Sequence, residues 1–161
     1  MAKINENLES LTSNILLNND LYKIPVNILK IAKANDIAVY KADLEKKILG
    51  AIRYDKESKK YTILLNEKQT HEQQRFTLAH ELGHFFLHKE ILESNELHVD
   101  IMYKIEDEQE AEVDYFAGAL LMNRLLLEKM YEKNPSIRDL AEMFEVSISV
   151  MTIRLDILGL I

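Results

Sequence analysis

Residues 70–88 read Thr70-His-Glu-Gln-Gln-Arg-Phe-Thr-Leu-Ala-His-Glu-Leu-Gly-His-Phe-Phe-Leu-His88, and they predict a helix around which the rest of the chain packs. Thr70 followed by Gln73 is typical of a capping box, in which each side chain satisfies a backbone N–H at the start of a helix. Apolar residues cover most of the surface of the helix that follows: Phe76, Leu78, Ala79, Leu82, Phe85, Phe86 and Leu87. Because a helix that is apolar nearly all round is normally buried, we expect this one to lie in the core.

The sequence before this helix predicts a small sheet for the helix to cover. Residues 37–40, 48–54 and 61–65 are rich in the residue types that favour strands. A short polar turn separates the last two runs, which predicts an antiparallel hairpin. We therefore expect an α+β fold, in which a small antiparallel three-stranded sheet packs against the buried helix and gains stability from it.

Further helices are expected on either side of this unit. Apolar residues recur at helical spacing over residues 8–18 and 26–34, and Pro25 suits the first turn of the second helix. Another long helix fits residues 107–122. Residues 89–105 are polar and irregular, so neither a helix nor a strand is expected there.

Length and composition exclude several classes of protein. The chain has 161 residues, which is typical of one domain, and it contains no cysteine. Disulfide scaffolds, thiolate zinc sites and cysteine nucleophiles are therefore excluded. The first residues contain no apolar secretory segment, and no stretch approaches the roughly 20 apolar residues of a membrane span. We expect a soluble, cytoplasmic protein with no membrane partner.

The charge is distributed unevenly along the chain. Residues 1–80 contain 13 Lys and Arg against 10 Asp and Glu, whereas residues 81–161 contain 7 against 17. Residues 90–114 alone hold ten acids and one base, Lys104. Because such a surface repels phosphate, direct binding of nucleic acid is not expected. The acidic stretch is either a solvated loop that maintains solubility or a landing site for a basic protein.

The predicted buried helix contains the motif His80-Glu81-Leu82-Gly83-His84. Residues four apart lie on one face of a helix, about 6 Å apart along its axis, so the two imidazoles can bind one Zn²⁺. Glu81 can then accept a proton from water as a general base. Two histidines without a metal are the alternative, which the cost of burying unpaired polar groups disfavours. Gly83, unfavourable in a helix, predicts close approach of another backbone.

A catalytic zinc site needs a third protein ligand and one open position. His88 is four residues further along the helix, but the ends of a straight row of three would be about 12 Å apart. We therefore assign His88 to the helix end, where it complements the dipole. His98 and the downstream acids remain, and among them Glu110 and Asp114 share one face of the helix predicted over residues 107–122. Glu110 could bind the metal while Asp114 accepts the outer N–H of a ligand histidine.

Glu112 is the competing candidate for the third ligand. It is two residues from Glu110 and points about 200° away around the helix, so the two side chains cannot both face one metal. The four-residue spacing to Asp114 favours Glu110. Hydrolysis would also need a donor for the developing oxyanion, and the sequence does not rank the candidates, which are His98, Tyr103 and Tyr115.

The stretch from Arg75 to His88, followed by Glu110-Ala-Glu-Val-Asp-Tyr-Phe-Ala-Gly-Ala-Leu-Leu-Met122, resembles the ImmA/IrrE family of metallo-endopeptidases. The resemblance implies a gluzincin-like zinc site. Its ligands are His80, His84 and Glu110, its base is Glu81, and Asp114 stands where the family has Asn or Asp. The implied substrate is a helix-turn-helix repressor of a bacterium or mobile element, whose cleavage releases silenced genes. The sequence departs from the family pattern at Asn123, where Pro is usual, and at Val113, where Ala is commoner. Neither residue is one of the implied metal ligands.

The end of the chain has a sequence pattern typical of a helix-turn-helix. Ser136 and Ser147 can each cap a short helix, with the break at residues 146–147. We expect a zinc metallopeptidase domain over residues 1–134, on which this helical tail, residues 135–161, packs to form a single compact unit.

Two other functions compete with a peptidase. The tail suggests a DNA-binding regulator, but its net charge from Arg138 and Arg154 against four acids is −2, which is unsuited to phosphate. We prefer a packing or substrate-docking role for it. The second alternative is a regulator in which zinc stabilises the fold without catalysis.

Overall fold

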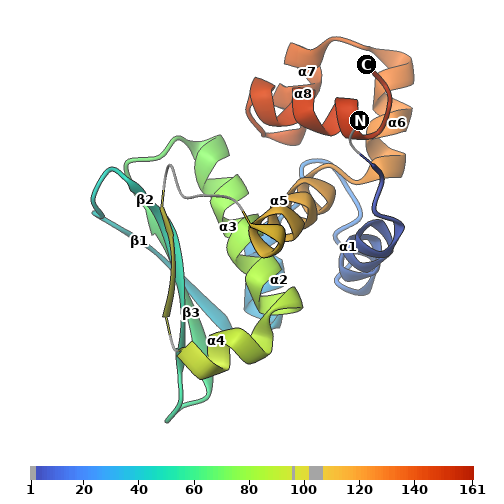
Figure 1. Ribbon diagram of the computed structural model, residues 1–161. Helices are drawn as coiled ribbons and strands as arrows, with labels where there is room; N and C mark the ends of the chain where they lie inside the picture. The colour runs from blue at the N-terminus through green and yellow to red at the C-terminus, as the bar shows by residue number, and fades with distance from the viewer. Residues whose placement is uncertain (1–2, 96, 102–106) are drawn as a thin grey trace.

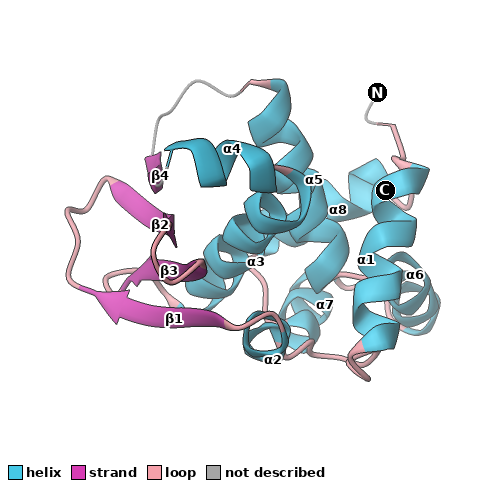
Figure 2. Ribbon diagram, turned by 90° about the horizontal axis from the view of Figure 1, so that it is seen from below, coloured by secondary structure: helices cyan, strands magenta, loops and turns pink. Residues whose placement is uncertain are grey.

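The computed structural model describes residues 3–95, 97–101 and 107–161. Figures 1 and 2 show a sheet on one side of the molecule and the helices gathered on the other, with α3 between the sheet and α5. In chain order the elements are α1 (Glu6–Asn18), α2 (Ile28–Ala34), β1 (Ile37–Ala42), β2 (Ile48–Asp55), β3 (Lys60–Asn66), α3 (His71–Leu87), α4 (Lys89–Asn95), β4 (Leu97–Ile101), α5 (Glu108–Leu121), α6 (Arg124–Lys133), α7 (Ile137–Phe144) and α8 (Ile148–Ile157). The α+β class is as expected.

The sheet differs from the prediction of three antiparallel strands. It has four strands in the order β1-β3-β2-β4, and β1 is parallel to β3, with Ile37 opposite Tyr61. The hairpin of β2 and β3 is antiparallel as predicted. Strand order is set by packing between distant segments, which the pattern of a single strand does not encode. β4 was missed although Leu97-His-Val-Asp-Ile101 alternates apolar and polar residues, because acidic residues dominate the sequence around it.

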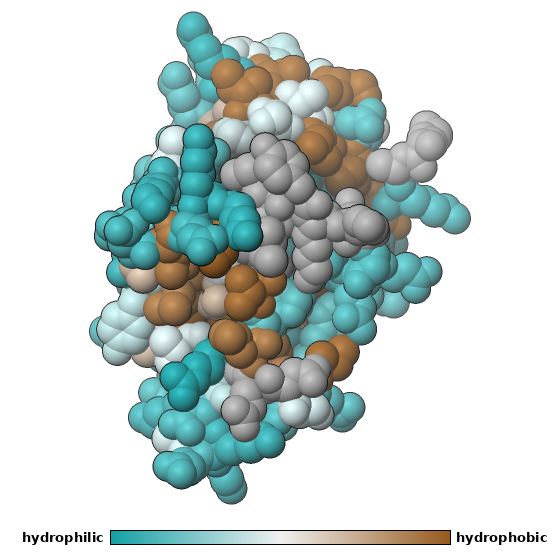
Figure 3. Space-filling model, turned by 60° about the vertical axis from the view of Figure 1, so that its left-hand side comes forward, coloured by the Kyte–Doolittle hydropathy of each residue, from teal (hydrophilic) through white to brown (hydrophobic). Residues whose placement is uncertain are grey.

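The two faces of the sheet carry different side chains. In the pairing register, Ala51 of β2 lies beside Leu64 and Val99, whereas Ile52 lies beside Ile63 and His98. Since successive side chains point to opposite faces, His98 is on the side of α3 with the fully buried Ile52 and Ile63. Figure 3, turned so that the sheet side of the molecule comes forward, shows patches of apolar surface among hydrophilic side chains.

α3 begins and packs as its sequence predicts. Thr70 and Gln73 form the capping box, with the Gln73 N–H donating to Thr70 Oγ1 at 3.2 Å and the Thr70 N–H donating to Gln73 Oε1 at 2.9 Å. Gly83 is where α5 comes close. A Cβ at this position would lie 2.8 Å from Val113 Cγ1, so a neighbour does come close, but it is a side chain, and the prediction that a backbone would approach Gly83 was wrong.

The other helices follow the predictions in part. The α2 helix begins at Ile28 with Asn27 as its cap, so the placement of Pro25 in the first helical turn was wrong. Asn27 offers a side-chain oxygen to the Lys30 N–H at 3.3 Å, a role that proline cannot perform. The expectation of an irregular segment over residues 89–105 was also wrong, since α4 and β4 lie within it.

α6 was not predicted, and Asn123 explains where it begins. The Asn123 side chain accepts the Leu126 N–H at 3.2 Å and donates to Ser13 Oγ of α1 at 3.0 Å. The residue that departs from the family pattern is therefore the cap of α6 and also ties this helix to α1.

The helical tail starts its two helices as predicted. The hydroxyls of Ser136 and Ser147 accept the N–H groups of Asp139 and Val150, each at 3.2 Å. The guanidinium of Arg75, on α3, donates to the carbonyls of Val26, Phe144 and Glu145, and so connects the tail to α3 and to the segment before α2. The boundary at residues 134 and 135 remains a prediction.

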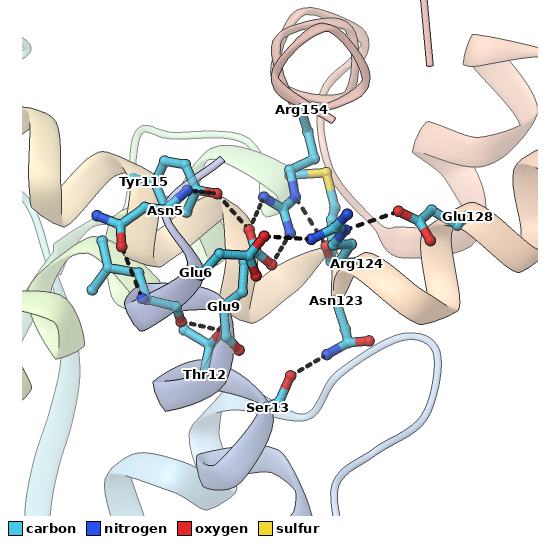
Figure 4. A network of polar contacts seen from close by, with 12 residues as sticks. Asn5, Glu6, Glu9, Thr12, Ser13, Tyr115, Asn123, Arg124, Glu128 and Arg154 are labelled. Carbon is cyan, nitrogen blue, oxygen red and sulfur yellow. Dashed lines mark hydrogen bonds and ion pairs between the residues drawn. The ribbon is translucent and has the colours of Figure 1, made fainter. Parts of the chain in front are cut away.

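A buried ion pair connects the tail to the first helix (Figure 4). Arg154 of α8 is 2% exposed and donates to both oxygens of Glu9 at 2.8 Å. Tyr115 of α5 donates to Glu9 Oε2 at 2.6 Å, and Arg154 Nε donates to the Met122 carbonyl at 3.0 Å. The carboxylate, the guanidinium and the phenol therefore satisfy one another. Within the described part of the chain, no helix is both long and apolar enough to cross a membrane.

Candidate metal centre

Two helices bring the predicted site residues together. α3 carries His80 and His84 one turn apart, on the side that faces α5, and α5 supplies Glu110. These three residues are only 8%, 3% and 8% exposed. The close packing at Gly83 lets the two helices approach at this level, because a larger side chain there would collide with Val113.

The donor atoms lie at distances that suit one metal ion. His80 Nε2 is 3.1 Å from Glu110 Oε2, and His84 Nε2 is 3.4 Å from Glu110 Oε1. One possible ligand atom from each residue lies within 4.8 Å of the others. A tetrahedral Zn²⁺ with bonds of about 2.0–2.1 Å separates its ligand atoms by about 3.3 Å. The two imidazoles and the carboxylate therefore fit the requirements of a zinc site.

Asp114 fixes the orientation of His80. The Nδ1–H of His80 donates to Asp114 Oδ1 at 2.8 Å. With its proton on Nδ1, the imidazole presents the lone pair of Nε2 to the space beside Glu110, which is the tautomer that a metal ligand requires.

Glu81 lies on the side of α3 that faces β2. It is fully buried, and its Oε1 would lie 3.4 Å from a Cβ placed on Gly50 of that strand. The same Cβ would be only 2.6 Å from Thr77 Cγ2, so only glycine lets α3 lie this close to β2. The role of Gly50 was not predicted, although a glycine inside a strand is a signal for close approach.

The structure separates the three candidates for an oxyanion donor. His98 lies at the centre, with its Nε2 3.4 Å from Glu110 Oε1 and its ring 4.1 Å from the ring of His84. The Tyr115 hydroxyl instead donates to Glu9 in the buried ion-pair cluster. Tyr103 lies outside the described residues. Of the two candidates that the structure describes, only His98 faces the proposed metal ligands.

His88 and Glu112 form a second layer around the centre. His88 is the C-cap of α3, as expected of a helix-end residue, but its ring also contacts the site. Its Nδ1 lies 3.4 Å from His84 Nδ1 and its Nε2 lies 3.3 Å from Glu112 Oε1. Burial and the nearby His84 lower the pKa of His88, although Glu112 acts in the opposite direction, so this ring favours the neutral form. Glu112 is thus near the centre but not among the three grouped donors.

The comparisons with known proteins agree with this geometry. The peptidase family described as the IrrE N-terminal-like domain matches residues 32–156. Metallopeptidase ImmA of Bacillus subtilis (strain 168) is 30% identical over 135 residues, which cover 83% of this chain and 77% of that protein. The chain belongs to the ImmA/IrrE metallopeptidase family. Family membership and the buried His80, His84 and Glu110 cluster both indicate a metal ion.

A solved structure shows the same fold in a longer protein. It is titled Mycobacterium tuberculosis transcriptional regulator, and it matches with a TM-score of 0.69 and 17% sequence identity. The match covers 96% of this chain but 47% of that one, so the chain spans about half the length of its structural relative. At this identity, the match concerns the fold alone.

Proposed function

We propose that the chain is a zinc-dependent endopeptidase whose ligands are His80, His84 and Glu110. The observation that carries the proposal is the convergence of two imidazole nitrogens on one buried carboxylate, at 3.1 and 3.4 Å. Zinc bound there would polarise a scissile carbonyl and make water reactive at neutral pH. The further steps of hydrolysis depend on residues of the chain itself.

Glu81 is the proposed general base. It follows His80 directly on α3, and its burial between this helix and β2 keeps bulk water away from the carboxylate. In the proposed reaction Glu81 accepts the proton of the attacking water and then passes it to the leaving amine. Asp114 keeps His80 in the required tautomer throughout.

His98 is the proposed donor to the oxyanion. Its imidazole approaches the centre from β4, whereas Glu110 approaches from α5. An N–H at this position can donate to the carbonyl oxygen of a substrate as negative charge develops on it. This assignment gives a role to a histidine of β4 that is not one of the three proposed metal ligands.

The proposed substrate is a helix-turn-helix repressor, which the family resemblance suggests and which would place the reaction in the cytoplasm. Acidic residues at the start of α5 support a basic partner, since Asp107, Glu108 and Glu112 are all exposed. Glu112 contacts His88, which in turn lies against His84 of the centre. A positively charged protein would therefore be attracted to the side of the molecule where the bond is cut.

A DNA-binding role for the tail fits the structure less well. α8, the helix that would have to read DNA, contains one basic residue, Arg154, which is buried against Glu9. With its guanidinium committed to this carboxylate, α8 offers no cation for phosphate. A regulator that binds zinc without catalysis stays the alternative, and the experiment below distinguishes it from a peptidase.

The test is cleavage of a repressor by the wild-type chain and by Glu81→Gln. The probe is a purified helix-turn-helix repressor with a basic surface, and the fragments are identified by mass spectrometry. We expect the wild type to produce two fragments, and Glu81→Gln to keep its zinc while cleavage falls at least about 10²-fold. Equal cleavage by both proteins would exclude the assigned base, and no cleavage by zinc-loaded wild type would favour the non-catalytic regulator.

A further inference from the structure

The two proposed histidine ligands are held in different ways. The outer nitrogen of His80 donates directly to a carboxylate, Asp114, at 2.8 Å. The outer nitrogen of His84 instead lies 3.4 Å from Nδ1 of another imidazole, His88. Nε2 of His88 in turn lies 3.3 Å from Glu112 Oε1. A series of contacts between two imidazoles and one carboxylate therefore leads from Glu112 of α5, through His88, to His84.

The direction of the hydrogen bonds in this series of contacts follows from the proposed role of His84 as a metal ligand. A metal on Nε2 of His84 takes the lone pair of that nitrogen and leaves the proton on Nδ1. This N–H can donate only to a lone pair, so Nδ1 of His88 must be the acceptor. The proton of the neutral His88 ring is then on Nε2, and this N–H donates a hydrogen bond to Glu112. One pattern of protons thus satisfies all the groups.

The spacing of the histidines along α3 gives His88 this position. His80, His84 and His88 occupy successive turns, and the first and the last are too far apart to share one ion. Of His80 and His84, His88 therefore reaches the nearer ring, that of His84, with 5.6 Å between the two ring centres. Its side chain is 11% exposed, so the ring is held within the site and not in solvent.

We propose that His88 is a positioning residue for His84, and that Glu112 acts on the metal through His88. The inference rests on the proposed metal centre. His88 and Glu112 together do for His84 what Asp114 does alone for His80: they hold the ring with Nε2 toward the metal. Partners of this kind typically contribute about 10–100-fold to metal affinity.

The test measures zinc affinity by competition with a chromophoric chelator, in the folded protein and without any substrate. We expect His88→Ala to weaken zinc binding by about 10–100-fold and Glu112→Ala by up to about tenfold. Glu108→Ala is the matched control, since it removes another exposed acid of α5, and it should bind zinc like the wild type. His88→Gln restores an acceptor for the His84 N–H and should recover part of the affinity.

Two further measurements separate positioning from a general loss of structure. The double variant His88→Ala/Glu112→Ala should bind zinc no more weakly than His88→Ala, because Glu112 has no route to His84 without His88. The visible spectrum of the Co²⁺-substituted protein should change in His88→Ala and remain unchanged in Glu108→Ala. Additive losses in the double variant, or wild-type affinity in His88→Ala, would overturn the positioning role alone. A wild-type chain that binds no metal would overturn the metal centre and this inference with it.

Discussion

α5 contributes to two buried polar clusters, and each of them surrounds a buried carboxylate with different partners. On one side, Tyr115 belongs to a cluster in which Glu9 is matched by both arms of the Arg154 guanidinium at 2.8 Å. On the other side, Glu110 faces the imidazoles of His80, His84 and His98 at 3.1–3.4 Å. The first cluster contains its own permanent cation. The second is built from groups that are metal ligands in their neutral and anionic forms.

The difference indicates what each cluster is for. A guanidinium in a bidentate pair stays charged and fixed, so the cluster of Glu9 and Arg154 joins the first helix to the last one. Imidazoles with their outer nitrogens held by Asp114 and His88 are oriented for something that binds between them. We therefore expect substitutions in the first cluster to change stability, and substitutions in the second to change metal binding and catalysis.

The largest effect is expected for Glu9→Ala. It leaves the buried Arg154 without its carboxylate, which should lower the free energy of unfolding by about 3–5 kcal/mol. Urea denaturation measures this loss, and metal analysis of the remaining folded protein should still give the wild-type zinc content. Glu6→Ala, on the same helix but with an exposed side chain paired to Arg124, should change stability by at most about 1 kcal/mol. Loss of zinc without loss of stability in Glu9→Ala would reverse the roles of the two clusters.

The next effect is expected for His98→Ala. Removal of the proposed oxyanion donor should lower kcat by about 10²–10³-fold with little change in KM. Zinc content should stay at the wild-type value, because His98 is outside the ligand set. Steady-state kinetics with a cleaved repressor, together with metal analysis, check both statements. A normal kcat, or zinc lost along with activity, would show that His98 has a different role.

Asp114→Ala should give an intermediate effect. Without this carboxylate His80 is free to rotate or change tautomer, so zinc affinity or activity should fall by about 10–100-fold. Chelator competition measures the affinity. Asp156→Ala removes an exposed acid from α8 and provides a comparison. The assignment fails if the two variants bind zinc equally well.

The smallest effect concerns pH. Burial alone would raise the pKa of Glu9, but the hydrogen bonds and charge of Arg154 outweigh it and hold the pKa below its ordinary value of 4.5. A depressed pKa in the folded state means that the ionised Glu9 stabilises the fold above pH 4.5, and that this contribution disappears as the pH falls through the lower value. The stability difference between wild type and Glu9→Gln should therefore shrink below pH 4.5 in urea titrations. A difference that does not depend on pH would contradict the ion pair.

The two regions also differ in how far the sequence predicted them. Within each helix of the metal centre, four-residue intervals were enough to place His80 beside His84 and Glu110 beside Asp114, whereas the pairing of α3 with α5 was implied by the family resemblance. The contact between Glu9 and Arg154 joins residues 145 positions apart, and no local pattern encodes such a pairing. The same limit explains why β1 was not predicted to be parallel to β3, and why the contact of His88 with Glu112 was missed.

Metal analysis of protein purified without chelator shows whether His80, His84 and Glu110 hold a zinc ion. We expect about one zinc per chain in the wild type, and almost none in His84→Ala and Glu110→Ala. His71→Ala, at the start of the same helix and paired with Glu145 at the surface, should keep the full amount. One zinc per chain in both His84→Ala and Glu110→Ala would contradict the account.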